Sequence, residues 1–259
     1  YIEKLLDFNR GLDSERCRHN VVKGTRQKIC VCMNRYEPAA IPGLVRSSIQ
    51  LLTGHSKPEE MAIWLRLYGM SDIMNGDLTG SEMHFMQAVE VFEHSAEKEQ
   101  YRYNLAASYA GLGEVRRLQW DYEGALSYYE QAIAICEDYR ISGSAATFYT
   151  YAGQAAVDNG DLVRAEDYLT KAVECFDKIE LLWERGLAFA YFGMLHFRKG
   201  NYQEMLSSLA TAKRCSEQLG SRYELGVLNR MFAQIALEME HNPQLRAVCS
   251  GQISHPART

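Results

Sequence analysis

The chain has 259 residues, of which 47% are hydrophobic and 24% are charged, and its formal net charge is −5. This composition excludes a disordered chain and gives no overall attraction to nucleic acid or anionic membranes. No apolar stretch is long enough to cross a bilayer, and an odd count of seven cysteines argues against a secreted disulfide framework. We expect a cytoplasmic protein and, because the chain does not begin with Met, a piece of a longer one.

Residues 1–56 are predicted to form divergent helices, with a degenerate helix pair over 13–53. Residues 1–57 carry ten basic and five acidic side chains, and no acid lies between Glu15 and Glu37. This basic block could dock to an acidic surface or to nucleic acid, or it could be a solvated face or a contact with an upstream domain. No interleaved aromatic residues support nucleic-acid binding. The block consists of Arg16, Arg18, Lys23, Arg26, Lys28 and Arg35.

Four later stretches align with one another without internal gaps. Each contains a glycine followed 19 residues later by an alanine, and successive glycines lie 44, 40 and 40 residues apart. Constant units joined by connectors of variable length are typical of stacked repeats. The glycines are Gly69, Gly113, Gly153 and Gly193, and the alanines are Ala88, Ala132, Ala172 and Ala212.

Each half of a unit has the periodicity of an amphipathic helix. In residues 122–139, for example, apolar side chains recur at i, i+3, i+4 and i+7. The connectors Asn75-Gly76-Asp77 and Asn159-Gly160-Asp161 provide a glycine for a left-handed helix end and an aspartate to cap the next helix. The units are therefore predicted to be antiparallel helix pairs, and the fold to be all-α.

These spaced small and aromatic positions resemble the tetratricopeptide repeat (TPR), in the long-repeat branch found in bacterial signalling regulators and kinesin light chain. The resemblance implies a right-handed α-solenoid over residues 57–249, followed by a flexible tail over 250–259. One position departs from the family pattern, because a usual large aromatic is replaced by Asp72, Arg116, Ala156 and His196. The predicted units are 62–95, 106–139, 146–179, 186–219 and 222–249.

Three cysteines, one histidine and the apolar face of the last repeat are interpreted as structural features. Cys136, Cys175 and Cys215 fall at near-equivalent places and are interpreted as small buried hydrophobic residues. His196 is expected to pack inward. The first helix of the last unit, 222–239, would expose an apolar face unless something covered it. This face predicts contact with a second copy or with missing sequence. That face comprises Leu225, Leu228, Phe232 and Ile235.

The first helices of such a solenoid line its concave groove, and the resemblance implies which of their residues face it. Their mixture of Met, Arg, amide and carboxylate groups would suit a peptide, a partner protein or a small amphipathic ligand. The alternative is that these residues are solvated or packed between helices. The implied groove residues are Arg66, Met70, Met74, Glu114, Arg117, Thr150, Gln154, Asp158, Met194, Arg198, Arg230 and Gln234.

No phosphate-binding loop, zinc-protease or nucleophile-elbow motif occurs in the sequence, so we expect no catalysis, metal or cofactor. The sequence favours a binding and oligomerisation module of a larger cytoplasmic transcriptional or signalling regulator. It would bind a peptide, protein or small ligand in its groove, with no membrane association and no direct nucleic-acid binding. Two alternatives remain, a constitutive adaptor without a small ligand and an accessory domain of an enzyme such as a nucleotide hydrolase.

Overall fold

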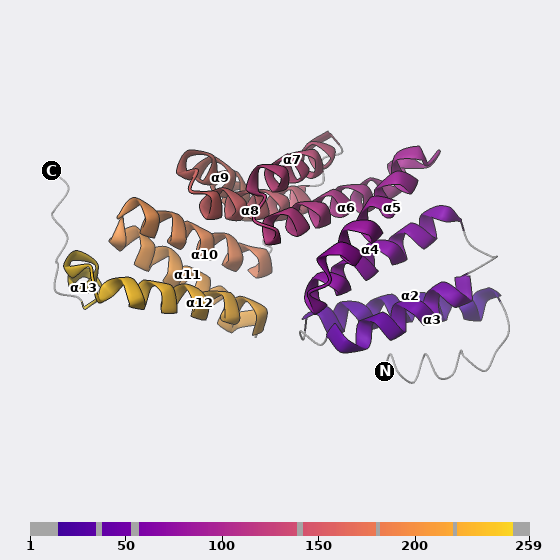
Figure 1. The fold of residues 1–259 in the computed structure, drawn as a ribbon, viewed down its shortest axis with the longest axis horizontal. Helices are drawn as coiled ribbons and strands as arrows, with labels where there is room; N and C mark the ends of the chain where they lie inside the picture. The colour runs from indigo at the N-terminus through magenta and orange to yellow at the C-terminus, as the bar shows by residue number, and fades with distance from the viewer. Residues whose placement is uncertain are drawn as a thin grey trace. The chain divides into compact units, whose positions relative to one another are not determined.

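The computed structural model describes residues 15–34, 38–52, 57–138, 142–179, 182–219 and 222–250. These residues form helices and the turns between them, and no strand occurs in the described ranges, which confirms the predicted all-α fold. The helices divide into two compact units, Tyr1–Ser144 and Ala145–Thr259 (Figure 1). No described helix has the length and apolar character needed to cross a membrane. The first fourteen residues and all of the predicted tail over 250–259 except Ser250 lie outside the described ranges.

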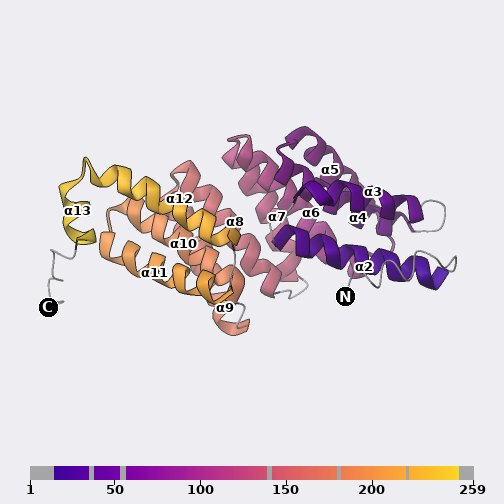
Figure 2. The ribbon, with the colours of Figure 1, turned by 90° about the horizontal axis from the view of Figure 1, so that it is seen from below.

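Unit 1 is built from a helical N-terminal region and two full helix pairs. α4 packs against α5, α6 packs against α7, and α5 also packs against α6 (Figures 1 and 2). Lys23 and Arg26 of the basic block are exposed on α2. The elements are α2 (Glu15–Asn34), η1 (Pro38–Ala40), α3 (Ile41–Leu52), α4 (Pro58–Asn75), α5 (Leu78–His94), α6 (Lys98–Leu118) and α7 (Tyr122–Asp138).

Unit 2 repeats the same arrangement. α10 packs against α11 and α9, and α12 packs against both α10 and α11. The short α13 packs against α11 and α12, and its Asn242 cap also donates a hydrogen bond to the Tyr202 hydroxyl at 2.6 Å. The helices are α8 (Ser142–Asn159), α9 (Leu162–Ile179), α10 (Leu182–Lys199), α11 (Tyr202–Leu219), α12 (Arg222–Met239) and α13 (Pro243–Cys249).

The repeat glycines allow the two helices of each pair to approach closely. A β-carbon added at any of them would lie 2.6–3.0 Å from a large side chain of the second helix, sixteen residues later, and the repeat alanines on that helix are fully buried. Any larger residue would force the helices apart. The close contacts are Gly69 with Phe85 (3.0 Å), Gly113 with Tyr129 (2.7 Å), Gly153 with Leu169 (2.6 Å) and Gly193 with Leu209 (2.6 Å).

The turns within the helix pairs follow the predicted chemistry, with one exception. Gly76, Gly160 and Gly200 adopt positive φ angles of 75–82°, as expected of left-handed helix ends. The Asp77 carboxylate accepts a hydrogen bond from the Gly80 amide at 2.9 Å, so it caps the following helix. In the α6–α7 turn the equivalent residue is Trp120, which has a φ of 67° and is 79% exposed.

The cysteine interpretation is confirmed for the two positions that are buried, Cys136 and Cys215, while Cys175 is half-buried. Burial, together with the neighbouring Glu137, raises the pKa of the Cys136 thiol to about 11. A thiol with this pKa remains protonated at neutral pH and behaves as a small apolar residue.

The expected exposed face of α12 is only partly present. Leu228 and Ile235 are buried, at 2% and 4% exposure, because α12 packs against α10, α11 and α13. The face was expected to be exposed unless something covered it, and these two residues are covered within the chain. Phe232 is 39% exposed, and self-association through this end stays a prediction.

Candidate functional site

The first helices of unit 1 present the beginning of the predicted binding surface. The guanidinium of Arg66 on α4 lies over the Tyr103 ring of α6, 6.0 Å from its centroid, and donates to the Met70 sulfur at 3.4 Å. Arg66 is buried, whereas Met70 and Tyr103 are 37% and 47% exposed. This group therefore offers two accessible apolar side chains beside a cation held in place by a cation–π contact.

A second ordered cation lies farther along α6. Arg117 donates from two nitrogens to the Glu114 carboxylate, at 2.8 and 2.6 Å, and the Tyr129 hydroxyl donates to the same carboxylate at 3.0 Å. Tyr103, Glu114 and Arg117 lie on one side of α6, at spacings of eleven and three residues. We define the first-helix surface as Arg66, Met70, Tyr103, Glu114 and Arg117.

The remaining predicted groove residues differ widely in accessibility. In unit 2, Thr150, Gln154 and Met194 are only 1–5% exposed. The Thr150 hydroxyl donates to the Ala146 carbonyl of its own helix at 3.0 Å, so its hydrogen-bonding capacity is used within α8. The other residues are half-buried or exposed, with Met74 and Gln234 in the first class and Asp158, Arg198 and Arg230 in the second.

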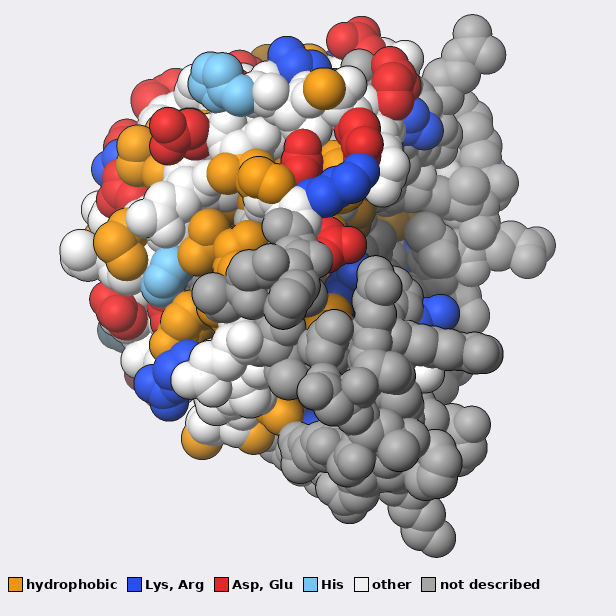
Figure 3. All heavy atoms as spheres, turned by 90° about the vertical axis from the view of Figure 1, so that its right-hand side faces the viewer, with side chains coloured by type: hydrophobic (Ala, Val, Ile, Leu, Met, Phe, Trp, Pro, Cys, Tyr) orange, Lys and Arg blue, Asp and Glu red, His pale blue; other side chains and the backbone are white. Residues whose placement is uncertain are grey.

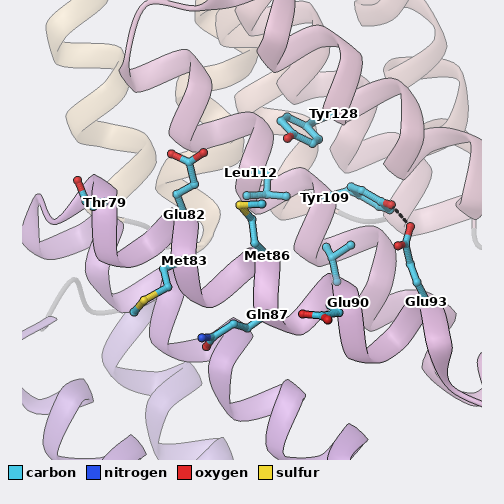
Figure 4. A pocket seen from close by; sticks show the side chains of 11 residues that line it. Thr79, Glu82, Met83, Met86, Gln87, Glu90, Glu93, Tyr109, Leu112 and Tyr128 are labelled. Carbon is cyan, nitrogen blue, oxygen red and sulfur yellow. Dashed lines mark hydrogen bonds between the residues drawn. The ribbon is translucent and has the colours of Figure 1, made fainter.

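The structure also contains a cleft that sequence analysis missed. It has a volume of about 650 Å³ and is lined by residues of α5, α6 and α7, so we call it the second-helix cleft (Figure 4). None of the twelve predicted groove residues lines it. The lining residues are Thr79, Glu82, Met83, Met86, Gln87, Val89, Glu90, Glu93, Tyr109, Leu112 and Tyr128.

Two of the cleft carboxylates are held in place by α6. Glu82 accepts a hydrogen bond from Arg116 at 2.5 Å, and Glu93 accepts one from the Tyr109 hydroxyl, drawn as a dashed line in Figure 4. Burial, and then the hydrogen bond to Glu93, raise the pKa of Tyr109, so its hydroxyl stays protonated. No ion pair to Glu90 occurs within the described part of the chain, and this residue is exposed.

The charge of α5 and α7 differs from that of the corresponding helices of unit 2. α5 and α7 together contain seven acidic residues and no Lys or Arg, whereas α9 and α11 contain six acids and five bases. Hydrophobic side chains lie among acidic ones on the described surface shown in Figure 3. On α5, Met83 and Met86 are 50% and 55% exposed. The absence of bases and the i, i+3 methionines were the sequence signals that could have revealed this cleft.

Among the described residues, no three His, Cys, Asp or Glu side chains are grouped so that they could hold a metal ion. His84 pairs with Asp72 at 2.8 Å, but its ring stacks on Tyr68 with a centroid separation of 4.6 Å. This pair joins α4 to α5, and we interpret it as a packing interaction.

Comparison with known proteins identifies the repeats. Residues 60–138, which cover most of α4 to α7, match the family model of the tetratricopeptide repeat. No curated protein sequence matches the chain.

Solved structures share the fold at low sequence identity. BtubC (BKLC) from P. vanneervenii is 14% identical, over 85% of this chain and 89% of its own, with a TM-score of 0.66. A Rap protein complexed with competence and sporulation factor is 13% identical, over 97% and 77%, with a TM-score of 0.73. A Podosopora anserina kinesin light chain with TPR-like repeats is 14% identical, over 76% and 96%, with a TM-score of 0.56.

Proposed function

We propose, from the premise that this chain is a TPR-like helical-repeat protein, that it is the partner-binding module of a larger cytoplasmic regulator. The observation that carries the proposal is the first-helix surface of unit 1. Its exposed Met70 and Tyr103 lie beside the ordered guanidinium of Arg66, and Arg117, farther along α6, is held by Glu114. A surface that is ordered before binding loses less conformational entropy when a partner docks.

The chemistry of this surface favours a peptide with an apolar side chain and a carboxylate. Met70 and Tyr103 would receive the apolar side chain, since methionine adapts its shape and tyrosine contributes a rigid ring. Arg66 would face the carboxylate beside this side chain. Arg117 lies fourteen residues after Tyr103, about 21 Å farther along α6, so it would face a second carboxylate, although Glu114 neutralises part of its charge. Asp158, Arg198 and Arg230 are the exposed groove residues of unit 2 that a longer partner could also contact.

Selection of binding peptides from a random library would test this proposal. The full chain serves as bait, and the affinity of each selected peptide is then measured by fluorescence anisotropy. We expect Met70→Asp and Arg117→Ala each to weaken binding by about tenfold, which corresponds to about 1.4 kcal/mol. Arg214 of α11 is exposed, so Arg214→Ala is the matched control and should change affinity less than twofold. An empty selection, or equal losses in all three variants, would refute the proposal.

A constitutive adaptor is a second candidate function. It is favoured by the presence of two separate surfaces in unit 1, because an adaptor must bind two proteins together. A small-molecule sensor would instead gain stability with its ligand, by about 2.7 kcal/mol at a hundredfold excess over Kd. Thermal denaturation with pooled peptides and sugars separates the two, since an adaptor shows no shift with small ligands.

A further inference from the structure

We propose that the second-helix cleft of unit 1 docks an amphipathic helix of a partner protein, one that carries Lys or Arg beside an apolar stripe. This surface is separate from the first-helix surface, so the inference does not depend on the function proposed above. It follows from the shape of the cleft, its apolar lining and the charge of its walls.

The cleft has the length of a short helix. Its α5 residues run from Thr79 to Glu93 at spacings of three and four, which places them on one side of the helix. Fourteen residues of α-helix extend about 21 Å, so the cleft matches about four turns of a docked helix. Recognition of this kind places the i, i+3, i+4 and i+7 side chains of a helix in an apolar groove.

Methionine gives the cleft an adaptable apolar lining. Met83 and Met86 are 50% and 55% exposed, and Leu112 and Val89 supply further apolar surface from α6 and α5. Exposed methionines are common on surfaces that bind amphipathic helices, because their flexible, polarisable side chains fit differently shaped partners. In Figure 4, Met83 and Met86 lie between Glu82 at one end and Glu90 at the other along α5.

The charge of the walls selects the sign of the partner. Glu82, Glu90 and Glu93 line the cleft, and no Lys or Arg is among its lining residues. α5 and α7 contain no Lys or Arg, and the bases of α6 lie outside the lining. Arg116 offsets only Glu82, and Tyr109 donates to Glu93 without neutralising it. Such a field attracts Lys and Arg side chains and repels phosphate groups, so it opposes nucleic acids and anionic membranes.

A pair of synthetic peptides provides the test. One is a helical Leu/Lys peptide of about 14 residues, and the other has Glu in place of every Lys. Fluorescence anisotropy with the full chain, at about 50 mM and about 500 mM NaCl, measures their affinities. We expect the Leu/Lys peptide to bind at least tenfold more tightly than its Leu/Glu twin, and to lose affinity at the higher salt concentration.

Matched variants locate the binding. Glu90 and Glu174 are exposed and each lies 21 residues after its repeat glycine, one in unit 1 and the other in unit 2. We expect Glu90→Lys to weaken Leu/Lys binding at least tenfold and Glu174→Lys to change it less than twofold. Met86→Gln should weaken it about fivefold, whereas Thr170→Gln at the equivalent exposed place should leave it unchanged.

Three outcomes would overturn the inference. They are equal binding of the two peptides, equal effects of Glu90→Lys and Glu174→Lys, and equal effects of Met86→Gln and Thr170→Gln. Circular dichroism confirms that each variant remains folded. Met70→Asp should leave Leu/Lys binding intact, so failure at the first-helix surface is distinguished from failure at this cleft.

Discussion

The second helices of the repeat pairs are alike in burial on the inner face, which packs on the first helix, and differ in charge on the outer face. On α5, α7, α9 and α11, the residues that face the first helix are almost fully buried, at 0–1% exposure, at all three repeat places. Their outer faces diverge, because α5 and α7 carry only acids whereas α9 and α11 carry both signs of charge. The inner residues are Ser81, Phe85 and Ala88; Ala125, Tyr129 and Ala132; Ala165, Leu169 and Ala172; and Met205, Leu209 and Ala212.

This difference separates the residues that build the fold from those available for recognition. The inner positions are fixed by volume, because each pair must close over its glycine. The outer positions make few packing contacts, so their charge can change without disturbing the pair. A bias in charge or in methionine content on an outer face is therefore informative about binding, and unit 1 has both.

The largest expected effect tests the shared inner face. Gly113→Ala and Gly153→Ala each place a methyl group within 2.7 Å of a large side chain, and should lower the free energy of unfolding by about 2 kcal/mol. Gly226 on α12 is the control, since nothing lies within 4 Å of a β-carbon added there. Gly226→Ala should stabilise the protein by about 0.5–1 kcal/mol through helix propensity.

Urea denaturation followed by circular dichroism measures all three variants. If Gly113→Ala were neutral while Gly153→Ala was costly, the two units would not share one packing rule. The two units would then differ in the packing of their inner faces as much as in the charge of their outer faces.

A smaller effect is expected in the α6–α7 turn, where the units differ in backbone strain. Trp120 adopts the left-handed conformation that glycine provides in the other three turns. Trp120→Gly should therefore raise the unfolding free energy by about 1 kcal/mol, and Gly160→Ala should lower it by about the same amount. Thermal denaturation measures both changes. A destabilised Trp120→Gly protein would mean that the Trp120–Tyr122 ring contact outweighs the strain.

The fold was predictable from sequence because its determinants are local and repeated. The glycine-to-alanine spacing fixed which helices pair, and the Asp77 and Asp161 caps fixed where they begin. For α12, the burial of Leu228 and Ile235 follows from its packing against α10, α11 and α13, a tertiary property that the apolar pattern of one helix does not specify.

The candidate sites were less predictable. The family resemblance predicted twelve groove residues, but it did not indicate that Gln154 and Met194 are buried, since burial depends on the size of neighbouring side chains. The second-helix cleft arises from the spacing of α5 and α7 over α6, a tertiary property. Its residues Met83 and Glu90 were therefore missed, although their charge and hydrophobic pattern was visible in the sequence.

One further position distinguishes the units through a polar group inside a helix pair. Asp72 and His196 both replace the usual aromatic, three residues after a repeat glycine. Asp72 accepts a hydrogen bond from His84, whereas the buried Nδ1 of His196 has no partner in the described part of unit 2. Burial lowers the pKa of His196 and outweighs the opposing effect of Glu204. Unit 1 thus satisfies its buried polar group and unit 2 does not.

The smallest predicted effect follows from this difference and depends on pH. His196→Phe keeps the stack on Phe192, whose ring centroid lies 5.9 Å away, and should stabilise the protein by about 0.5 kcal/mol at pH 8 by removing the unpaired nitrogen. The unfolded chain binds a proton near pH 6.5 more readily than folded His196 does, so the wild-type protein loses stability as the pH falls below 6.5. The advantage of the variant should therefore be larger at pH 5.5 than at pH 8, as measured by urea midpoints. Exposed His241→Phe should show no such growth. A constant advantage at both pH values would mean that His196 titrates equally in the folded and unfolded states, and that unit 2 tolerates its polar group as well as unit 1 does.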